Sequence, residues 1–538
     1  MTTSTQFTEG WNSLSSFNEP FSPDNITFLR QCMHDFDLNI RSNPMEFQKF
    51  IGLKEQCEAI LRGIGFGKLP PELISEIFIH CLTMPGPGLK GGYPFFLRCS
   101  NAPFLFSKVC RRWRTVALST PALWTRFIVV LQRTSQAELI DCILERSRLL
   151  PLHVVVSSRD NGRRADMDNH LRAMNTLISN ISRLESFALQ ILEGADDLVP
   201  TLPPIPPAGA PNMRSIEFHD VNSSEPSRTS AWISELLCRS PNLQSLYLQP
   251  AQEIKLKGTV GVRLQHFKAS HGIQLQDLFA LLVNCAGLRT CEVQFRAPVH
   301  LGVVPLTRIL LKYLHTLVLT HAQRDDLEAV FTWLALPSLK KLALGGFRRA
   351  GWPDELFSNF LSRSRFSLKS LSLTALPVTE AHLLSYLHHS SINDSLEELA
   401  ICQWRPNSAS FLDHLTFKLP SSDTMHNPPP FLPKLSSISI TVDAITQAVA
   451  LRRFVASRWY DTAAYEVPLP IASLKDIHVC LTIPYAPNVN VSVDDIKLVF
   501  SRIARSRGTS LKLETITMAP PSSNQYAGIE RLTGHLVI

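Results

Sequence analysis

The sequence lacks the features of secreted and membrane proteins. Its 538 residues contain 11 cysteines, an odd and scattered set without a CxxC pair, so neither a disulfide framework nor a zinc knuckle is indicated. The longest apolar run is about six residues, 278–283, whereas a membrane-spanning helix needs roughly 18. No basic segment followed by an apolar one opens the chain. We therefore expect no secretory signal, no membrane partner and a cytoplasmic or nuclear location.

A strong excess of one charge is also absent. The 53 Lys and Arg residues oppose 46 Asp and Glu residues, and the net charge of +7 permits acidic partners without requiring nucleic acid. Hydrophobic residues make up 45% and charged residues 18%, which is typical of globular chains. The length predicts about three or four domains, or one repeat array with an attached module.

Signatures of catalysis are missing as well. The sequence has no HExxH, no GxSxG and no kinase motif set. The glycine-rich stretch 63–68 has three residues between its outer glycines, where a phosphate-binding loop has four. His382, His388 and His389 fall on one predicted helix without an acid or cysteine at metal-ligand spacing. We therefore predict no enzymatic activity, no cofactor and no metal site.

Composition divides the chain before any motif is considered. Residues 1–23 are rich in Ser, Thr, Asn and Pro and predict a disordered tail. Apolar residues at steps of three or four predict a helical leader over 24–66. Two proline-rich stretches, 200–211 and 419–433, predict loops inserted in the second half.

Residues 67–125 predict a small helical module. The first helix is expected in 69–82, where Pro71 suits the first turn, and a Gly- and Pro-rich insertion at 83–103 ends it. A second, single helix is expected over 106–119, with Cys110 packed inward, and Pro121 begins a short turn. The apolar positions that share the predicted helix faces are Leu69, Leu73, Ile74, Ile77, Phe78, Val109, Trp113, Val116 and Ala117.

These residues resemble the F-box family. Its pattern is a Leu-Pro pair opening a helix with an Ile-Phe-like end, a V-C-x-x-W helix and a P-x-L-W turn. Here the elements stand in that order at Leu69-Pro70, Ile77-Phe78, Val109-Cys110, Trp113 and Pro121 to Trp124. The match covers about a tenth of the chain and looks especially like the F-box proteins of mushroom-forming fungi. The 83–103 insertion is longer than the family's usual connection.

The resemblance implies a substrate-recognition subunit of a Skp-cullin-F-box ubiquitin ligase, which performs no covalent chemistry itself. The partners would be a Skp-type adaptor, cullin through that adaptor, and a protein substrate. An alternative is an F-box-like leucine-rich-repeat scaffold outside any ligase. Family analogy places the adaptor contacts on Leu69, Pro70, Leu73, Ile77, Phe78, Val109, Trp113 and Trp124.

A repeat occupies residues 126–538. After strands expected at 127–130 and 152–156, an apolar-x-x-apolar-x-apolar motif occurs eleven times from Leu184 to Val479, with a mean period of 29 residues. The predicted fold is therefore a helical F-box module followed by a curved, irregular leucine-rich-repeat-like β/α solenoid with a parallel sheet. Helices are expected at 137–149, 170–182, 230–240, 275–285, 325–336 and 379–391.

Such an array presents the central variable position of each motif on one concave surface. The mixed, partly apolar character of this row favours a protein substrate and disfavours nucleic acid. The candidate substrate-binding residues are Tyr247, Lys268, Glu292, Val318, Ser372 and His478, within a row that also holds Glu217, Ala343, Ala400 and Ser439.

Overall fold

The computed structural model describes most of the chain between Leu69 and Ile483. It covers 69–83, 95–96, 103–130, 136–158, 167–191, 202–220, 226–249, 263–295, 307–346, 351–402, 410–417, 430–443, 447–458, 471–483, 510–517, 534–537 and five single residues before 56. The predicted tail (1–23), nearly all of the predicted leader (24–66), most of the 83–103 insertion and most of the 419–433 loop lie outside the described residues.

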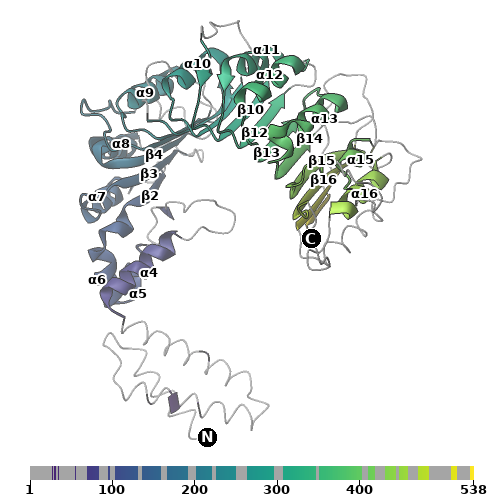
Figure 1. Cartoon of the computed structure of the whole chain (residues 1–538). Helices are drawn as coiled ribbons and strands as arrows, with labels where there is room; N and C mark the ends of the chain where they lie inside the picture. Colours follow the sequence, from purple (N-terminus) through teal and green to yellow (C-terminus); the bar gives the residue numbers. More distant parts are fainter. Residues whose placement is uncertain are drawn as a thin grey trace. The chain divides into compact units, whose positions relative to one another are not determined.

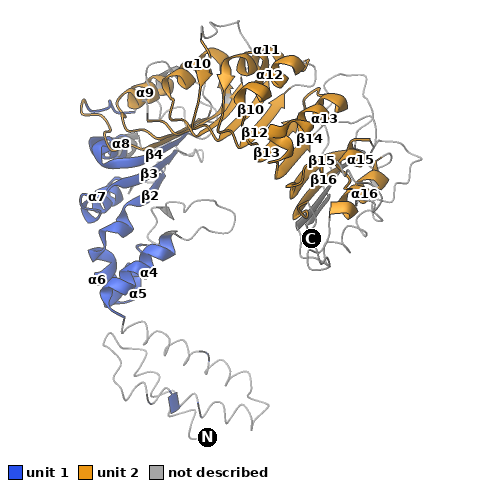
Figure 2. Ribbon diagram, in the orientation of Figure 1, with its two compact units in different colours: residues 1–206 blue, residues 207–538 orange. Residues whose placement is uncertain are grey.

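The chain forms two compact units, residues 1–206 and 207–538, which are coloured separately in Figure 2. We call them unit 1 and unit 2. Both combine helices with parallel strands, which confirms the mixed helix and parallel-sheet class expected from the sequence. Among the described residues, no helix has the length and hydrophobicity needed to cross a membrane.

From Leu69 onward, unit 1 continues with short helices. Pro71 occupies the first position of α4, where its missing N–H costs no hydrogen bond, and Thr83 ends that helix at the start of the insertion. Proline also opens the last one, as expected. The elements are α4 (Pro71–Thr83), α5 (Phe106–Val109), α6 (Arg111–Ser119) and the 3₁₀ helix η2 (Pro121–Trp124).

The single helix expected over 106–119 is wrong, because Cys110 interrupts it. Its backbone is extended (φ −156°, ψ 170°), so α5 ends at Val109 and α6 begins at Arg111. The Cys110 sulfur accepts a hydrogen bond from the backbone N–H of Trp113 at 3.5 Å, which caps the start of α6. Cys110 is therefore exposed, and its predicted inward packing is also wrong.

The remainder of unit 1 alternates strands with helices. The strands pair in parallel in chain order, and Phe127, Val154 and Phe187 are register partners along the buried face. The sequence missed β1, which lies inside the insertion. The elements are β1 (Phe95–Phe96), β2 (Arg126–Val130), α7 (Gln136–Arg146), β3 (Leu152–Ser158), α8 (Met167–Ser179), η3 (Ile181–Arg183) and β4 (Leu184–Ile191).

The strands of unit 2 form an ordered ladder. From β5 to β17 each strand of the main sheet pairs in parallel with the next, β18 pairs antiparallel with β17, and β9 and β11 form a separate two-stranded sheet. The strands are β5 (Ser215–Asp220), β6 (Ser245–Gln249), β7 (His266–Ile273), β8 (Thr290–Phe295), β9 (Ile309–Leu310), β10 (Thr316–Ala322), β11 (Leu334–Ala335), β12 (Lys341–Gly346), β13 (Ser370–Thr374), β14 (Glu398–Cys402), β15 (Ser437–Asp443), β16 (Asp476–Ile483), β17 (Ser510–Thr517) and β18 (Gly534–Val537).

Helices connect these strands and cover one face of the sheet (Figure 1). Three of the four helices expected from the sequence in this unit are present with ends shifted by a few residues, and the fourth, expected over 379–391, is divided at His389, whose backbone is extended, into α13 and α14. They are joined by others that the sequence analysis did not identify. The helices are α9 (Pro226–Cys238), α10 (Leu275–Asn284), α11 (Arg324–Trp333), α12 (Asp354–Ser364), α13 (Glu380–His388), α14 (Ser390–Asn393), α15 (Ser410–Leu415) and α16 (Ala448–Arg458).

The repeated apolar positions form the core. All three apolar members of every motif from Leu184 to Val479 are buried. Because successive side chains of a strand point to opposite faces, two of the three point together toward the helices, and the residue between them faces the other way. Each large member contributes roughly 1.5–3 kcal/mol by leaving water. The motif therefore fixes which face of each strand is open.

Three arginines join helix ends to neighbouring segments. Arg183 donates to the carbonyl oxygen of Leu144, within the last turn of α7, at 3.3 Å and to that of Leu150, beyond the end of α7, at 3.2 Å. Arg363 donates to two carbonyl oxygens at the end of α11, and Arg458 donates to one at the end of α15. Helix C-termini carry carbonyl groups without intrahelical partners, and these guanidinium groups satisfy them.

Candidate binding surfaces

Exposed apolar side chains collect on the helices of unit 1. Leu73 of α4 is 51% exposed and Val109 of α5 is 56% exposed, while Leu69, Ile77 and Trp113 are half-buried. We call these five residues the helical patch. The structure thus leaves five of the eight predicted adaptor contacts available to a partner, in addition to the exposed Pro70.

The other two predicted contacts lie in the interior. Phe78 stacks on Phe106 at a centroid distance of 4.3 Å and meets Trp113 edge-on at 4.9 Å. Trp124 is fully buried, and its indole N–H donates to the carbonyl oxygen of Ala117 at 2.9 Å. These two side chains hold the helices together and offer no surface to a partner in this conformation, so we remove them from the set of predicted contacts.

Polar contacts fix the arrangement of the helical patch. A guanidinium nitrogen of Arg112 in α6 donates to the carbonyl oxygen of Leu69, which ties the segment before α4 to the start of α6. Arg114 donates from Nε to the carbonyl oxygen of Ser107 at 2.7 Å, which ties α6 to α5. The patch is therefore assembled from three helices that hold one another in place.

The central motif positions of unit 2 form one continuous row. Starting at Glu217 of β5, each is the direct register partner of the next as far as His478 of β16, which itself pairs with Lys512 of β17. Neighbouring strands lie about 4.8 Å apart, so adjacent members of the row are within contact distance. The predicted residues Tyr247, Lys268, Glu292, Val318, Ser372 and His478 all belong to this row, which we call the open row.

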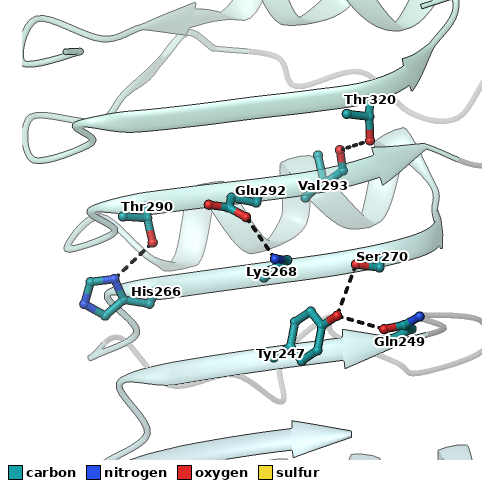
Figure 3. Close-up of polar contacts among 9 residues, drawn as sticks. All are labelled: Tyr247, Gln249, His266, Lys268, Ser270, Thr290, Glu292, Val293 and Thr320. Carbon is teal, nitrogen blue, oxygen red and sulfur yellow. Dashed lines mark hydrogen bonds and ion pairs between the residues drawn. The ribbon is translucent and has the colours of Figure 1, made fainter. Parts of the chain in front are cut away.

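Hydrogen bonds and charges link one end of the open row (Figure 3). The Lys268 ammonium lies 3.4 Å from a carboxylate oxygen of Glu292 and 5.3 Å from the centre of the Tyr247 ring. The Tyr247 hydroxyl donates to Oε1 of Gln249 at 2.8 Å and lies 3.5 Å from the Ser270 hydroxyl. These contacts restrain the tyrosine ring at the surface, and a restrained tyrosine is typical of protein-binding sites.

Several residues of this network escaped the sequence analysis. Gln249 and Ser270 follow the central position by two residues, and His266 and Thr290 precede it by two. The His266 ring and the Thr290 hydroxyl are 3.0 Å apart on adjacent strands (Figure 3). Because side chains two residues apart on a strand share a face, these positions could have been found from the motif itself.

The middle of the open row carries small side chains. Val318, Ala343, Ser372 and Ala400 succeed one another on β10, β12, β13 and β14, and all are half-buried. None of these four is charged. Between the charged pair on β7 and β8 and the histidine on β16, the row is thus a low, nearly neutral strip that a partner could approach closely.

The far end of the open row holds a serine and a histidine. The Ser439 hydroxyl lies 3.0 Å from Nδ1 of His478, and the Cys402 sulfur lies 3.6 Å from the same hydroxyl. In a Ser-His-Asp triad the serine faces Nε2, and the acid orients the ring through Nδ1. The serine here is on the opposite nitrogen, so we assign this contact to surface hydrogen bonding.

The three histidines of the sequence analysis do not converge. His382 lies 3.7 Å from a carboxylate oxygen of Asp354, His388 packs on the ring of Phe431, and His389 accepts a hydrogen bond from the backbone N–H of Ser391. Within the described part of the chain, no group of three or more His, Cys, Asp or Glu side chains could hold a metal ion.

Comparison with known proteins adds no assignment. No protein-family model matches this sequence, and no curated protein is significantly similar to it. The function is therefore argued from the two surfaces themselves.

Proposed function

We propose that this protein is the substrate-recognition subunit of a Skp-cullin-F-box ubiquitin ligase. In this proposal the helical module of residues 67–125 is an F-box that docks on a Skp-type adaptor. The β/α units that follow form a leucine-rich-repeat-like solenoid that holds a protein substrate. The protein itself would perform no bond-making step, and its contribution would be to bring the substrate close to the ubiquitin-charged enzyme.

The concentration of exposed apolar side chains on the helices of unit 1 carries the proposal. Ten large hydrophobic side chains are exposed among the described residues, and four of them fall within 69–124, a segment about a tenth of the chain in length. They are Leu73, Leu105, Val109 and Leu118. Exposed apolar groups gathered in this way mark protein interaction sites. Leu73 and Val109 are also among the adaptor contacts that the resemblance to the F-box family implies.

Unit 2 supports the second half of the proposal. Its open row runs without interruption from β5 to β16, with a restrained tyrosine, an exposed ion pair and a nearly neutral middle. An exposed ion pair contributes at most about 1 kcal/mol to stability. Lys268 and Glu292 can therefore break their contact and pair with charged groups of a partner at little cost. A surface of this type suits a folded protein substrate.

The test is co-expression with the Skp-type adaptor of the same organism, followed by size-exclusion chromatography. We expect the wild type to elute with the adaptor as a 1:1 complex. The double variant Leu73→Glu/Val109→Glu should lose the complex, because each change places a charge in an apolar contact. Since both side chains are more than half exposed, the double variant should remain folded.

Leu149→Glu is the matched control. Leu149 is also an apolar residue of unit 1 and is 90% exposed, but it lies outside the helical patch. This variant should bind the adaptor as the wild type does. Separate elution of a folded wild type would contradict the proposal and favour the scaffold alternative. Equal loss of binding in the control would show that the helical patch is not the docking site.

A further inference from the structure

Charge separates between the two edges of the unit 2 sheet. We call the edge at which the parallel strands begin the starting edge. The segments that lead into β8, β10, β12 and β13 contain eight Lys and Arg residues and no Asp or Glu; these segments are 283–290, 307–316, 334–341 and 361–370. At the opposite edge, the first turns of α10, α11, α12 and α13 contain acids, namely Asp277, Asp325, Asp326, Asp354, Glu355 and Glu380.

The repeating topology explains the position of the acids. Each of these helices follows the end of a strand and therefore begins at one edge and ends at the other. Helix N-termini favour acids, because of the partial positive charge that unpaired backbone N–H groups leave there. Helix C-termini do not explain the cations, since the last turns of α10 and α11 hold no basic residue and Arg289 and Lys340 lie beyond the ends of these helices.

Six of these cations are exposed and, within the described part of the chain, form no ion pair. They are Arg289, Arg308, Lys312, Lys340, Lys341 and Arg365. We call the first five, which lie in the segments that lead into β8, β10 and β12, the basic edge. Backbone hydrogen bonds place their strands side by side, since His315 N–H donates to the carbonyl of Arg289 at 2.8 Å and Lys340 N–H donates to that of His315 at 2.8 Å.

Apolar side chains accompany the basic edge. Val283, Leu310 and Tyr313 are each more than half exposed, and they make up three of the ten exposed large hydrophobics in the described chain. Leu310 belongs to β9, which pairs with β11 beside the start of β12. The charge of Arg308 is close enough to lower the pKa of Arg363 in α12, in addition to the larger effect of burial. Cations and apolar groups thus share one surface.

We propose that the basic edge, together with Val283, Leu310 and Tyr313, binds a short acidic segment of a partner protein, which carries carboxylates or phosphates next to apolar residues. The basic edge spans the starts of β8, β10 and β12. At roughly 4.8 Å per strand, and with the side chains reaching outward on both sides, it matches about five residues of extended peptide. Charge complementarity selects the acidic residues, and the three apolar side chains select their neighbours.

Nucleic acid fits this surface less well. Lys369 of the next segment is paired with Glu397 at 2.6 Å, and Glu398 opens β14 beside it, so acids close the row of cations on that side. A nucleic acid strand would continue past this point and meet negative charge.

The experiment measures fluorescence anisotropy of labelled nine-residue peptides with the full-length protein. One peptide alternates Glu and Leu, a second alternates phosphoserine and Leu, and a third alternates Gln and Leu as the uncharged reference. A single-stranded RNA with the same charge as the Glu peptide is the fourth probe. We expect both acidic peptides to bind at low salt, the reference not to bind, and binding to weaken as salt is raised. The two acidic peptides distinguish carboxylate from phosphate recognition.

Single charge reversals locate the site. Lys340→Glu and Arg289→Glu should each raise the dissociation constant about fivefold, since an exposed charge contact contributes up to about 1 kcal/mol. Arg452→Glu is the control, because Arg452 is an exposed cation of α16 and the net charge changes equally. Circular dichroism melting checks that all three variants are folded. Equal weakening by the control would overturn the inference, because binding would then follow net charge alone.

Two other outcomes would also overturn it. One is failure of both acidic peptides to bind; the other is RNA binding tighter than either of them. Only the assignment of the acidic segment to a ubiquitylation substrate rests on the proposed function. Peptide binding by the basic edge and adaptor binding by the helical patch can fail separately. A protein that binds the adaptor but ignores the peptides keeps the proposed function and loses this inference. A protein that binds the peptides but not the adaptor keeps this inference and loses the proposed function.

Discussion

Arg458 provides the sharpest test of how unit 2 is held together. Its side chain is 1% exposed at the end of α16, and its guanidinium donates to the carbonyl oxygens of Leu415 at 2.8 Å, Leu432 at 2.9 Å and Phe431. These acceptors belong to the end of α15 and to the segment that leads into β15. One buried cation therefore ties three consecutive pieces of the chain together. We consider the substitution Arg458→Met, which keeps much of the aliphatic volume and removes every donor.

The magnitude follows from the carbonyl groups that lose their partner. A hydrogen bond to a charged group has a net value of about 1.5–3 kcal/mol, and a buried acceptor left unsatisfied costs about 1–3 kcal/mol. Against this, the variant no longer has to remove a guanidinium from water, which returns several kcal/mol. With two bonds of ordinary length and a third acceptor, we expect a net loss of roughly 3 kcal/mol of local stability.

The matched control is Arg453→Met on the same helix. Arg453 is 65% exposed and lies 3.3 Å from a carboxylate oxygen of Asp413, so this exposed pair should contribute less than about 1 kcal/mol. Arg458→Lys is a third variant, which keeps the charge but cannot reach three carbonyls in the same geometry. It should lose nearly as much stability as the methionine variant.

Hydrogen–deuterium exchange read by mass spectrometry is the appropriate assay, because a chain with two compact units need not unfold in one step. Peptides covering β15 and α16 should exchange about a hundredfold faster in Arg458→Met, which corresponds to roughly 3 kcal/mol. Peptides covering α4 and α6 should be unchanged. If Arg458→Met and Arg453→Met differed by less than about threefold, the assignment of a tying role to the buried guanidinium would be refuted.

Two further predictions concern titratable groups. Burial raises the pKa of Asp326, whose side chain accepts a hydrogen bond from the backbone N–H of Gln323 at 2.9 Å at the start of α11. The folded state therefore binds a proton on the Asp326 carboxyl group more tightly than the unfolded state does. The stability that this protonation contributes is lost as pH rises above about 4. Asp326→Asn keeps an acceptor and cannot ionise, so it should raise the melting temperature at pH 7 and not at pH 4; an equal change at both pH values would contradict the argument. Burial also raises the pKa of Cys285 to about 11 and of Cys291 to about 12, so at pH 8 a thiol reagent should label the exposed Cys81, Cys110 and Cys238 in the folded protein and spare these two. Peptide mapping after labelling checks this, and early modification of Cys285 would count against it.

The strands of unit 2 could be predicted from the sequence because their signal is local. In Leu314-x-x-Leu317-x-Leu319 the spacing alone states which side chains are buried, and all three are. The open row could be predicted as well, because repeat units that begin at equivalent motif positions align those positions across the sheet. Helices such as α12 were missed because apolar residues spaced for a helix also occur in loops, and no repeated motif marked them.

The helical module was harder to predict because a helix face can meet more than one neighbour. Leu73 and Ile74 are adjacent in the sequence, yet the first is exposed and the second is buried. The apolar spacing of α4 could not show which of them would face α6. The prediction for Cys110 was wrong for a related reason. The helical spacing of apolar residues continues through Cys110, and only the backbone geometry shows that this residue ends α5 and caps α6.

The division between buried and exposed residues within the F-box-like pattern has a functional consequence. A pattern defined by residue type alone mixes side chains that build the module with side chains that could meet a partner. Trp124→Ala would remove a fully buried indole together with its hydrogen bond to Ala117, so a loss of adaptor binding in that variant would report unfolding. Leu73→Glu changes only an exposed side chain, and a loss there would report the contact. The helical patch and the basic edge also lie in different units, more than 200 residues apart in sequence for Leu73 and Arg289. Variants of the two should therefore combine additively, because sites that share no partner side chain rarely couple by more than about 0.5 kcal/mol.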